Sequence, residues 1–432
     1  MNRRDFLKNT GQAVIALGML NALWDKTYAA SIGDPTTAAR AMNALGLDLL
    51  RQGTEASGNA LLSPFSIQTA FAMTWTGADG ATKAEMAKVL HYPEDEAEVQ
   101  SSFQALQKAL DDIATSTTER AANAKKFGGA SEPITLAAAN RLFGQADYAF
   151  RDTFLKTVEG VYGAPLQALD FQKNSAGARK TINDWVADRT NKRIQDLVPP
   201  DGIDRDTRLV LVNAIFLKAP WTKEFPESAT QPAPFHLTPD RQKDVPTMRH
   251  QDRFGYARED GFTTVTIPYV GGEIQFLVLL PDAGQSLGAL ESQVTPERLV
   301  ACGKSAMKEV LLYLPKFKLE PPLMRLSRAL QTLGMKTAFN IPRGSANFDR
   351  MAPRRPDDYL CISEAFHKTF LALDEKGTEA AAATAVAMMR VTSAIMKEPD
   401  PIEVRVDRPF LFAIQHRASG ACLFLGRVTD PS

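Results

Sequence analysis

Residues 374–386 read Asp-Glu-Lys-Gly-Thr-Glu-Ala-Ala-Ala-Ala-Thr-Ala-Val, and the interpretation of this stretch decides the fold. Alanine has the highest helix propensity, so a short exposed helix or a linker is the first interpretation. In an extended chain, alternate residues would share one face, and that face would carry small side chains: Thr378, Ala380, Ala382 and Thr384. Such a strand could enter between two existing strands, with Gly377 as its hinge. The segment alone favours the helix or linker, so its surroundings must decide.

The composition excludes several classes of protein. The chain has 432 residues, with 50 Lys and Arg against 50 Asp and Glu, so its formal net charge is zero. A zero balance argues against a strongly basic nucleic-acid-binding protein. The hydrophobic fraction of 44% is close to the average of globular proteins, which excludes bulk disorder.

Cysteine and histidine spacing gives no indication of a metal site or of disulfides. Cys302, Cys361 and Cys422 are odd in number and lie far apart, so no disulfide framework is expected. No C-x-x-C or H-E-x-x-H motif occurs, and no two of the five His are three or four residues apart. The sequence therefore predicts neither a metal nor a cofactor.

The N-terminus has the layout of an export signal. Arg3-Arg4 opens a basic segment, and an apolar run of about a dozen residues follows from Ala13 to Trp24. Paired arginines are typical of the twin-arginine (Tat) route, and the run is shorter than the ~20 residues that span a bilayer. Cleavage before Ala30 would remove residues 1–29 as the signal peptide. The mature chain, 30–432, is then expected in the periplasm or outside the cell, without a membrane span.

The periodicity predicts an α+β fold. Amphipathic helices dominate the first part of the chain, and strands dominate the last hundred residues, without an internal repeat or domain break. Within the first part, Thr82 and Glu85 are expected to form a capping box, and Thr115–Glu132 is expected to be a loop. Further along, Gly271-Gly272 predicts a hairpin turn.

A possible nucleophile motif is set aside. Gly284-Gln285-Ser286-Leu287-Gly288 matches G-x-S-x-G, but that chemistry needs the serine directly at a strand-to-helix turn. Here Pro281-Asp282-Ala283 separate the predicted strand from Ser286. Ser286 is therefore expected to be a helix N-cap, and the chain is not expected to be an enzyme.

The surroundings of residues 374–386 resemble the serpin family of protease inhibitors, over nearly the whole mature chain. Six motifs in the same order carry the resemblance: Asn59–Met73 with Ser63-Pro64-Phe65-Ser66-Ile67, Leu209–Ala214 continuing to Trp221, Leu314-Pro315-Lys316-Phe317, Ile362–Lys368, Glu375–Thr384 and Val404–Ile414. The resemblance implies a single large α+β domain with a central, mostly antiparallel sheet, smaller sheets, helices packed around them and an exposed reactive-centre loop at about 375–400.

The resemblance also implies roles for individual residues. The polar cluster under the central sheet, called the shutter, is matched by Ser63, Ser66, Asn213 and His367. Trp221 matches the breach, the top of the sheet where the loop begins to insert. The hinge of the loop is matched by Glu375, Gly377, Thr378, Glu379, Ala380, Ala381, Ala382, Ala383 and Thr384.

An inhibitory serpin, as the family's mechanism implies, is a suicide substrate. A serine protease, or a cysteine protease, attacks the loop and forms an acyl-enzyme, and the cleaved hinge then inserts into the central sheet as a new strand. The native state must be metastable for this. The small residues of the hinge favour inhibition over the alternative, a non-inhibitory binding or chaperone protein. The expected partner is the target protease, bound covalently by a monomer, with no nucleic acid.

Two positions remain open for the reactive bond. The common count of seventeen residues from Glu375 gives Val391–Thr392, which suits an elastase-like or subtilisin-like protease. A count one residue shorter gives Arg390–Val391, which suits a trypsin-like protease.

Overall fold

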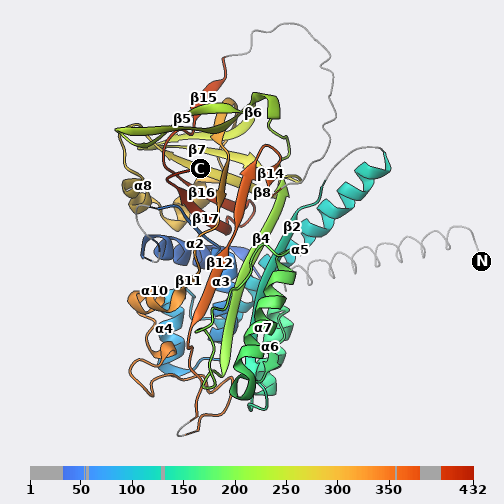
Figure 1. Cartoon of the computed structure of the whole chain (residues 1–432), viewed down its shortest axis with the longest axis vertical. Helices are drawn as coiled ribbons and strands as arrows, with labels where there is room; N and C mark the ends of the chain where they lie inside the picture. The colour runs from blue at the N-terminus through green and yellow to red at the C-terminus, as the bar shows by residue number, and fades with distance from the viewer. Residues whose placement is uncertain (1–32, 53, 55–57, 128–131, 356–357, 380–399) are drawn as a thin grey trace, which may run out of the picture.

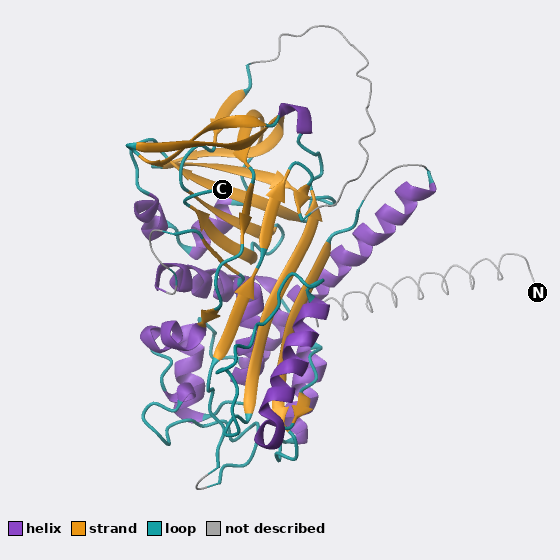
Figure 2. Ribbon diagram, viewed as in Figure 1, coloured by secondary structure: helices purple, strands orange, loops and turns teal. Residues whose placement is uncertain are grey.

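A computed structural model describes residues 33–52, 54, 58–127, 132–355, 358–379 and 400–432. The helices of eight or more residues are α2 (Pro35–Gln52), α3 (Pro64–Thr76), α4 (Gly80–Leu90), α5 (Glu96–Lys126), α6 (Asp152–Tyr162), α7 (Phe171–Arg189) and α10 (Leu326–Leu333). Two shorter helices are α8 (Leu287–Gln293) and α9 (Pro296–Cys302). The strands belong to two sheets, which Figure 2 shows as a long set of lengthwise strands and a second set across the upper part.

The first sheet, called here the central sheet, follows the long axis of the molecule (Figure 1). Its strands are β2 (Thr135–Gln145), β3 (Gln167–Leu169), β4 (Leu209–Pro220), β10 (Phe317–Leu319), β11 (Met324–Arg325), β12 (Ala365–Thr369), β13 (Leu371–Asp374) and β14 (Gly377–Thr378). Within this sheet β12 pairs parallel with β4 and β3 pairs parallel with β2, while the other pairings are antiparallel. The expected α+β fold with a mostly antiparallel central sheet is confirmed.

The second sheet packs across the upper end of the central sheet. Its strands are β1 (Ala60–Leu62), β5 (Gln231–Thr238), β6 (Arg241–Glu259), β7 (Phe262–Pro268), β8 (Ile274–Pro281), β9 (Met307–Pro315), β15 (Ile402–Arg405), β16 (Phe410–His416) and β17 (Cys422–Val428). Strands β7 and β8 pair antiparallel around Gly271-Gly272, so the predicted hairpin is confirmed. Ser286 caps α8 by accepting a hydrogen bond from the Ala289 N–H at 3.1 Å, as expected.

Side chains alternate along β4 between two hydrophobic cores. Leu211, Ile215 and Leu217 belong to the larger core, which also includes α2 and α3. Val212 and Ala214 belong to a smaller core together with side chains of α7. Because successive strand residues point to opposite faces, β4 is apolar throughout and covered on both sides. A new strand next to β4 would therefore also need small or apolar side chains.

The expected loop at Thr115–Glu132 is wrong over most of its length. Helix α5 continues through this segment to Lys126, for a total of 31 residues. Ile113, Thr117 and Ala121 recur at helical spacing and are buried, so small residues continue the apolar stripe. The Thr117 hydroxyl also accepts the Ile134 N–H at 3.2 Å, which attaches the extension to the start of β2. A segment rich in small and polar residues can therefore still form a helix with a buried face.

The expected capping box of Thr82 and Glu85 is also wrong. Helix α4 begins at Gly80, so Thr82 lies inside it and accepts the Asn347 N–H at 3.0 Å. The Glu85 carboxylate accepts the backbone N–H groups of Lys336 and Thr337, far away in sequence. Both side chains accept hydrogen bonds from residues that are distant in sequence, and a local sequence pattern gives no information about such partners.

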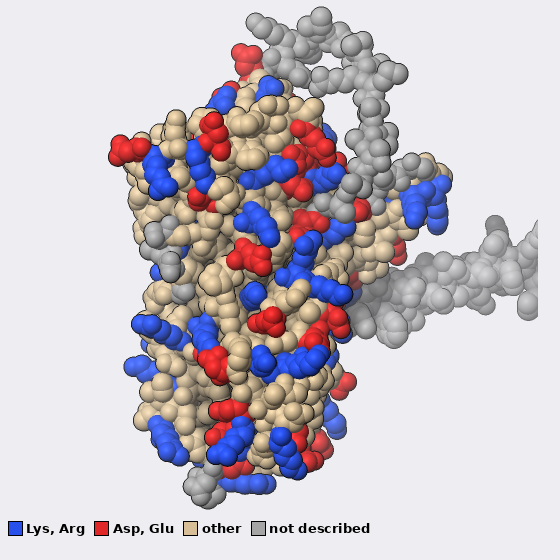
Figure 3. Space-filling view, viewed as in Figure 1, with Lys and Arg blue, Asp and Glu red and all other residues tan. Residues whose placement is uncertain are grey.

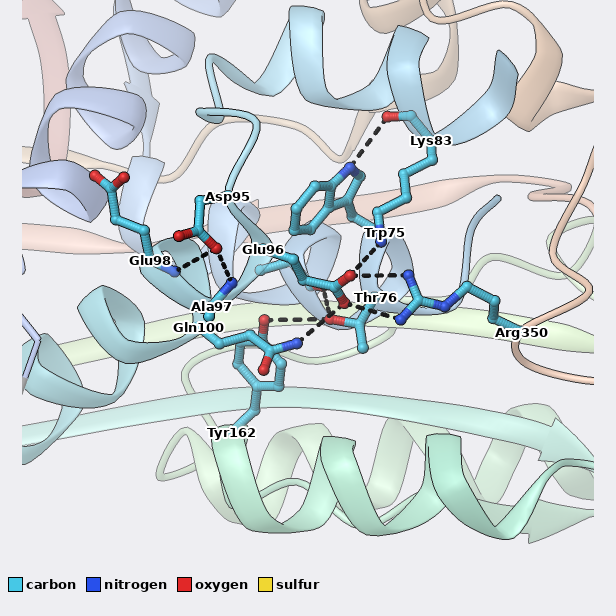
Figure 4. A network of polar contacts seen from close by, with 11 residues as sticks. Trp75, Thr76, Lys83, Asp95, Glu96, Ala97, Glu98, Gln100, Tyr162 and Arg350 are labelled. Atoms are coloured by element: carbon cyan, nitrogen blue, oxygen red, sulfur yellow. Dashed lines mark hydrogen bonds and ion pairs between the residues drawn. The ribbon is translucent and has the colours of Figure 1, made fainter. Parts of the chain in front are cut away.

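A polar network joins α4, the start of α5 and a distant loop (Figure 4). Asp95 caps α5 by accepting the Ala97 N–H at 2.8 Å. Glu96 forms ion pairs with Lys83 at 2.5 Å and with Arg350 at 2.8 Å. Burial alone would raise the pKa of Glu96, but the hydrogen bonds from Arg350 and Lys83 lower it below its usual value. The network joins α4 to the start of α5 and to the loop that carries Arg350.

Charges of both signs are interspersed over the face shown in Figure 3, in agreement with the zero net charge. None of the helices in the described ranges is long and apolar enough to cross a membrane. Within the same ranges, no group of three or more His, Cys, Asp or Glu is arranged to hold a metal ion.

Candidate functional site: the hinge and the central sheet

The first hinge residues lie between two strands of the central sheet. Gly377 and Thr378 form β14, which pairs antiparallel with β13 on one side and with the end of β4 on the other. Below this point β12 pairs directly with β4, in parallel, from Ala365 opposite Leu211 to Thr369 opposite Ile215. The hinge is therefore a wedge at the top of a seam between two parallel strands.

Gly377 has a conformation and a close contact that exclude other residues. Its φ is +147°, and a Cβ built at this position would lie 2.1 Å from the carbonyl oxygen of Ala219. Backbone atoms cannot move aside as a flexible side chain can. Glycine is thus required for the hinge to approach β4 so closely.

Thr378 fills a buried position over an aromatic stack. Its hydroxyl shares a hydrogen bond of 2.6 Å with the hydroxyl of Tyr269. The Tyr269 ring in turn stacks on Trp221, with ring centroids 4.4 Å apart and planes 9° from parallel. Burial raises the pKa of Tyr269, so its phenol stays protonated. A charged or bulky side chain in place of Thr378 would have no room and no partner here.

Trp221 holds the chain that leads into the hinge. Its indole N–H donates to the Asp374 carbonyl at 3.0 Å, and its backbone N–H donates to the Lys376 carbonyl at 2.9 Å. Trp221 itself is 2% exposed. The structure therefore places Trp221 at the top of the seam, next to the hinge. Sequence reasoning did not find Tyr269, because nothing local marks it as a partner of Thr378.

Glu375 anchors the start of the hinge through its side chain. The carboxylate forms an ion pair of 2.7 Å with Lys316 and accepts the Thr230 hydroxyl at 2.7 Å. Burial would raise the pKa of Glu375, but the hydrogen bonds from Lys316 and Thr230 lower it below its usual value. The sequence identified Lys316 as part of a motif but not as the partner of Glu375.

Glu379 ends the described part of the hinge in a left-handed conformation, with φ of +53°. Its N–H donates to the Ala372 carbonyl at 2.9 Å, and its carboxylate pairs with Arg193 at 3.0 Å. Burial raises the pKa of Glu379, although Arg193 opposes this effect. Arg193 lies between α7 and β4, so this ion pair joins the hinge to the segment that connects these two elements.

The four predicted shutter residues come together lower in the sheet, with a fifth that the sequence did not reveal. Asn140 of β2, Asn213 of β4 and His367 of β12 lie in register across three strands. Ser63 and Ser66 approach this row from the start of α3. The Ser66 hydroxyl donates to the Asn140 side-chain oxygen at 2.7 Å. The available signal for Asn140 was an asparagine that directly follows the apolar run Leu136–Ala139 of β2.

The hydrogen bonds of His367 define its tautomer. The Ser63 backbone N–H donates to Nε2 at 3.1 Å, so Nε2 carries no proton. Nδ1 carries the proton and donates to the Asn213 side-chain oxygen at 2.5 Å. Burial lowers the pKa of His367 to about 3, so the ring is neutral at physiological pH. Protonation would place an uncompensated charge in the sheet and remove the acceptor of Ser63.

The other predicted hinge and loop residues, Ala380, Ala381, Ala382, Ala383, Thr384, Arg390, Val391 and Thr392, lie outside the described residues.

The chain belongs to the serpin family. The family model described as Serpin (serine protease inhibitor) matches residues 40–431. Leukocyte elastase inhibitor of Homo sapiens is 37% identical over 397 residues, which cover 90% of this chain and 97% of that protein. The resemblance identified from six sequence motifs is thereby confirmed, and with it membership of a family of protease inhibitors.

Solved structures show the same fold. Uncleaved ovalbumin matches with a TM-score of 0.75 and 28% identity, covering 92% of this chain and 100% of that chain. Human thyroxine-binding globulin, solved in complex with thyroxine, matches with a TM-score of 0.75 and 25% identity, covering 92% and 99%.

Glu375→Gln should weaken the anchoring of the hinge. The variant keeps the shape of the side chain but loses the ion pair, and we expect a loss of about 1 kcal/mol because Lys316 remains partly hydrated. Since the folded-state pKa of Glu375 is lowered, the stabilisation is present above the unfolded-state pKa of about 4.3 and is lost as pH falls through the folded value. Urea unfolding midpoints at pH 7 and pH 3.5 would measure both effects.

Glu320→Gln is the matched control for this experiment. Glu320 pairs with Lys318 at 3.2 Å, but both side chains are at least half exposed. We expect its midpoint to stay close to that of the unmodified protein at both pH values. Equal effects of the two substitutions would contradict the anchoring role of Glu375.

His367→Gln should remove a pH dependence of stability. Because the folded-state pKa of His367 lies below the unfolded value of about 6.5, its contribution to stability is complete above pH 6.5 and is lost as pH falls towards 3. The slope for one such group is at most about 1.4 kcal/mol per pH unit. Burial also lowers the pKa of His250 and His416, and both remain in the variant. The difference between the two unfolding curves from pH 7 to pH 4 therefore isolates His367, and parallel curves would refute the assignment.

Proposed function

We propose that this protein inhibits a serine protease by trapping it as an acyl-enzyme. The serine hydroxyl oxygen of the protease would attack the carbonyl carbon of Val391, or of Arg390 in the alternative register. An ester would form as the peptide bond breaks, and the new amino group of the following residue would leave with a proton. A cysteine protease would form a thioester in the same way. The freed hinge would then insert between β4 and β12 before water hydrolyses the ester.

The wedge formed by β14 is the observation that carries this proposal. The hinge already pairs with β4 and with β13, the strand that directly follows β12 in the chain, so insertion would extend an existing pairing and needs no new nucleation. Insertion would replace one parallel pairing of β4 with β12 by two antiparallel pairings, which adds backbone hydrogen bonds along both edges. This gain in pairing is a source of free energy for distorting the attached protease.

The register of β14 agrees with the small residues that follow it. Thr378 lies opposite Ala219 of β4 and Leu373 of β13. In antiparallel pairing, each step along the hinge moves one residue back along both neighbours. Six further residues would set Thr384 between Asn213 and His367. Alanines at 380 and 382 would share the buried face of Thr378, where large side chains would clash.

The shutter would act as the barrier to this insertion. The hydrogen bond from His367 to Asn213 joins the two strands at the point that Thr384 would occupy. Insertion would have to break it, so the row would hold the seam closed until the loop is cut. The hydroxyl of Thr384 could then bind the polar groups that are separated.

A gel assay with three proteases tests the proposed function. The purified protein is mixed with trypsin, pancreatic elastase and subtilisin, and a covalent complex stable in denaturing gels is expected with at least one. The released C-terminal peptide is then sequenced by mass spectrometry. A peptide that begins at Thr392 identifies Val391–Thr392 as the bond, and one that begins at Val391 identifies Arg390–Val391.

Thr378→Arg should convert the inhibitor into a substrate. Position 378 is already buried over Tyr269, and a guanidinium cannot stay there without a charged partner. The arginine should therefore displace β14 from the top of the seam, so that insertion lacks its starting pair while the loop is still cut. We expect loss of most of the covalent complex and its replacement by cleaved protein. Thr378→Ser keeps the hydroxyl and should retain the complex. Complex formation by the arginine variant at the level of the unmodified protein would refute the insertion mechanism.

A binding function is the second candidate, since human thyroxine-binding globulin has the same fold and was solved with a bound hormone. Cleavage of the loop without any covalent complex, by all three proteases, would favour this alternative.

We also propose that the protein is exported by the twin-arginine route to the periplasm or beyond. The support is the sequence of residues 1–29. Replacing Arg3 and Arg4 together by lysine should keep most of the protein in the cytoplasm, as measured by cell fractionation. Arg40→Lys, in the mature chain, is the control and should be exported normally. Export of the double variant at the unmodified level would refute the proposal.

A further inference from the structure

Two exposed arginines and a half-buried tyrosine form a row across strands β6, β9 and β15 of the second sheet. Arg249 lies opposite Tyr313, and Tyr313 lies opposite Arg405 on its other side. Their neighbours along the strands, such as Leu312 and Val404, are buried. The row therefore faces outward, on a sheet whose other face belongs to the core.

Both arginines lie over the Tyr313 ring. The guanidinium carbon of Arg405 is 3.8 Å from the ring centroid, and that of Arg249 is 5.8 Å from it. Cation–π contacts of this kind hold an arginine side chain in place while its N–H groups remain in solvent. The row is thus a preorganised pair of guanidinium groups.

The charge of the two arginines is only partly satisfied. Arg405 forms an ion pair of 2.6 Å with Glu403, and its side chain is 48% exposed. For Arg249, no hydrogen bond or ion pair is found within the described residues. The same face carries the opposed pair Arg253 and Glu309 two alternations further along β6 and β9, and Glu309 accepts a hydrogen bond from Gln251 at 3.1 Å. Among these five side chains, the three arginines outnumber the two glutamates, which leaves the group positive.

The position of the row relates it to the reactive bond. Strand β15 begins at Ile402, which follows the predicted bond residue Val391 by 11 residues in sequence. Even a fully extended chain of this length spans at most about 35–40 Å. A protease that holds the bond must therefore stay within that distance of β15, which is comparable to the size of a protease domain. Figure 1 shows β15 at the same end of the molecule as β5 and β6.

We propose that the row of Arg249, Tyr313 and Arg405 is a docking site for an acidic surface of the target protease. This inference rests on the proposed inhibitory function and adds a property of the partner to it. Guanidinium groups bind carboxylates through paired hydrogen bonds, and a fixed guanidinium loses little entropy when it does so. The site raises the rate of association by electrostatic attraction and leaves the later insertion step unchanged.

Charge reversal at Arg249 tests the site, because Arg249 has the freer charge. The protease is the one that forms the covalent complex in the gel assay, used unmodified and with its lysines succinylated to make its surface more acidic. For the unmodified inhibitor, we expect association several-fold faster with the succinylated protease at low ionic strength. Arg249→Glu should lower that rate constant about tenfold, and 0.5 M NaCl should abolish the difference. The number of inhibitor molecules consumed per protease should not change.

Arg298→Glu is the matched control. Arg298 also lies over an aromatic ring, that of Phe262 at 4.9 Å, but on α9. This reversal changes the net charge equally and should leave the rate constant within twofold. Three outcomes would each overturn the docking site while the inhibitory function stands. They are equal effects of the two reversals, an effect of Arg249→Glu that persists in high salt, and no preference for the succinylated protease. Absence of a covalent complex with every protease would refute the proposed function, and this inference with it.

Discussion

The parallel pairing of β4 with β12 is the constraint on which the rest of the structure depends. Five consecutive residue pairs hold these strands together, and the hinge enters from above as an antiparallel wedge. Parallel pairing is slightly less stable per residue than antiparallel pairing. A strand inserted antiparallel to both β4 and β12 would therefore replace a weaker pairing by two stronger ones. Gly377 and Thr378 lie at the top of this seam, and the polar row of Asn213 and His367 lies within it.

The contacts around the seam divide into anchors above it and a clamp within it. Trp221, Lys316 and Arg193 bind the hinge through its carbonyl groups and its two glutamates. His367 and Asn213 join the two strands below. In the proposed insertion, the anchors would keep β14 at the top of the seam, and the clamp would oppose the entry of further residues. Loss of a clamp contact would lower the barrier to insertion, and loss of an anchor would free β14.

The two glutamates of the hinge illustrate how similar groups differ by environment. Glu375 accepts hydrogen bonds from Lys316 and Thr230, which outweigh burial and lower its pKa. Glu379 has Arg193 as its ion-pair partner, and burial prevails and raises its pKa. Acidification therefore neutralises Glu379 before Glu375. The ion pair of Glu379 with Arg193 is therefore lost first, while the ion pair of Glu375 with Lys316 persists.

The sequence by itself determined the α+β fold and the family, because the order and spacing of motifs are properties of the chain. Through its resemblance to the family, the sequence also predicted shutter roles for Ser63, Ser66, Asn213 and His367 and a breach role for Trp221, and these roles stay predictions. It missed Asn140, Tyr269 and Arg193 and misjudged Thr82, Glu85 and the end of α5, since each of these depends on a partner far away in sequence. Only the tertiary structure decided that Gly377 and Thr378 lie between β4 and β13. That position exists only because β4 and β13, which are distant in sequence, lie on either side of the hinge. Gly377 fits between them because it has no Cβ.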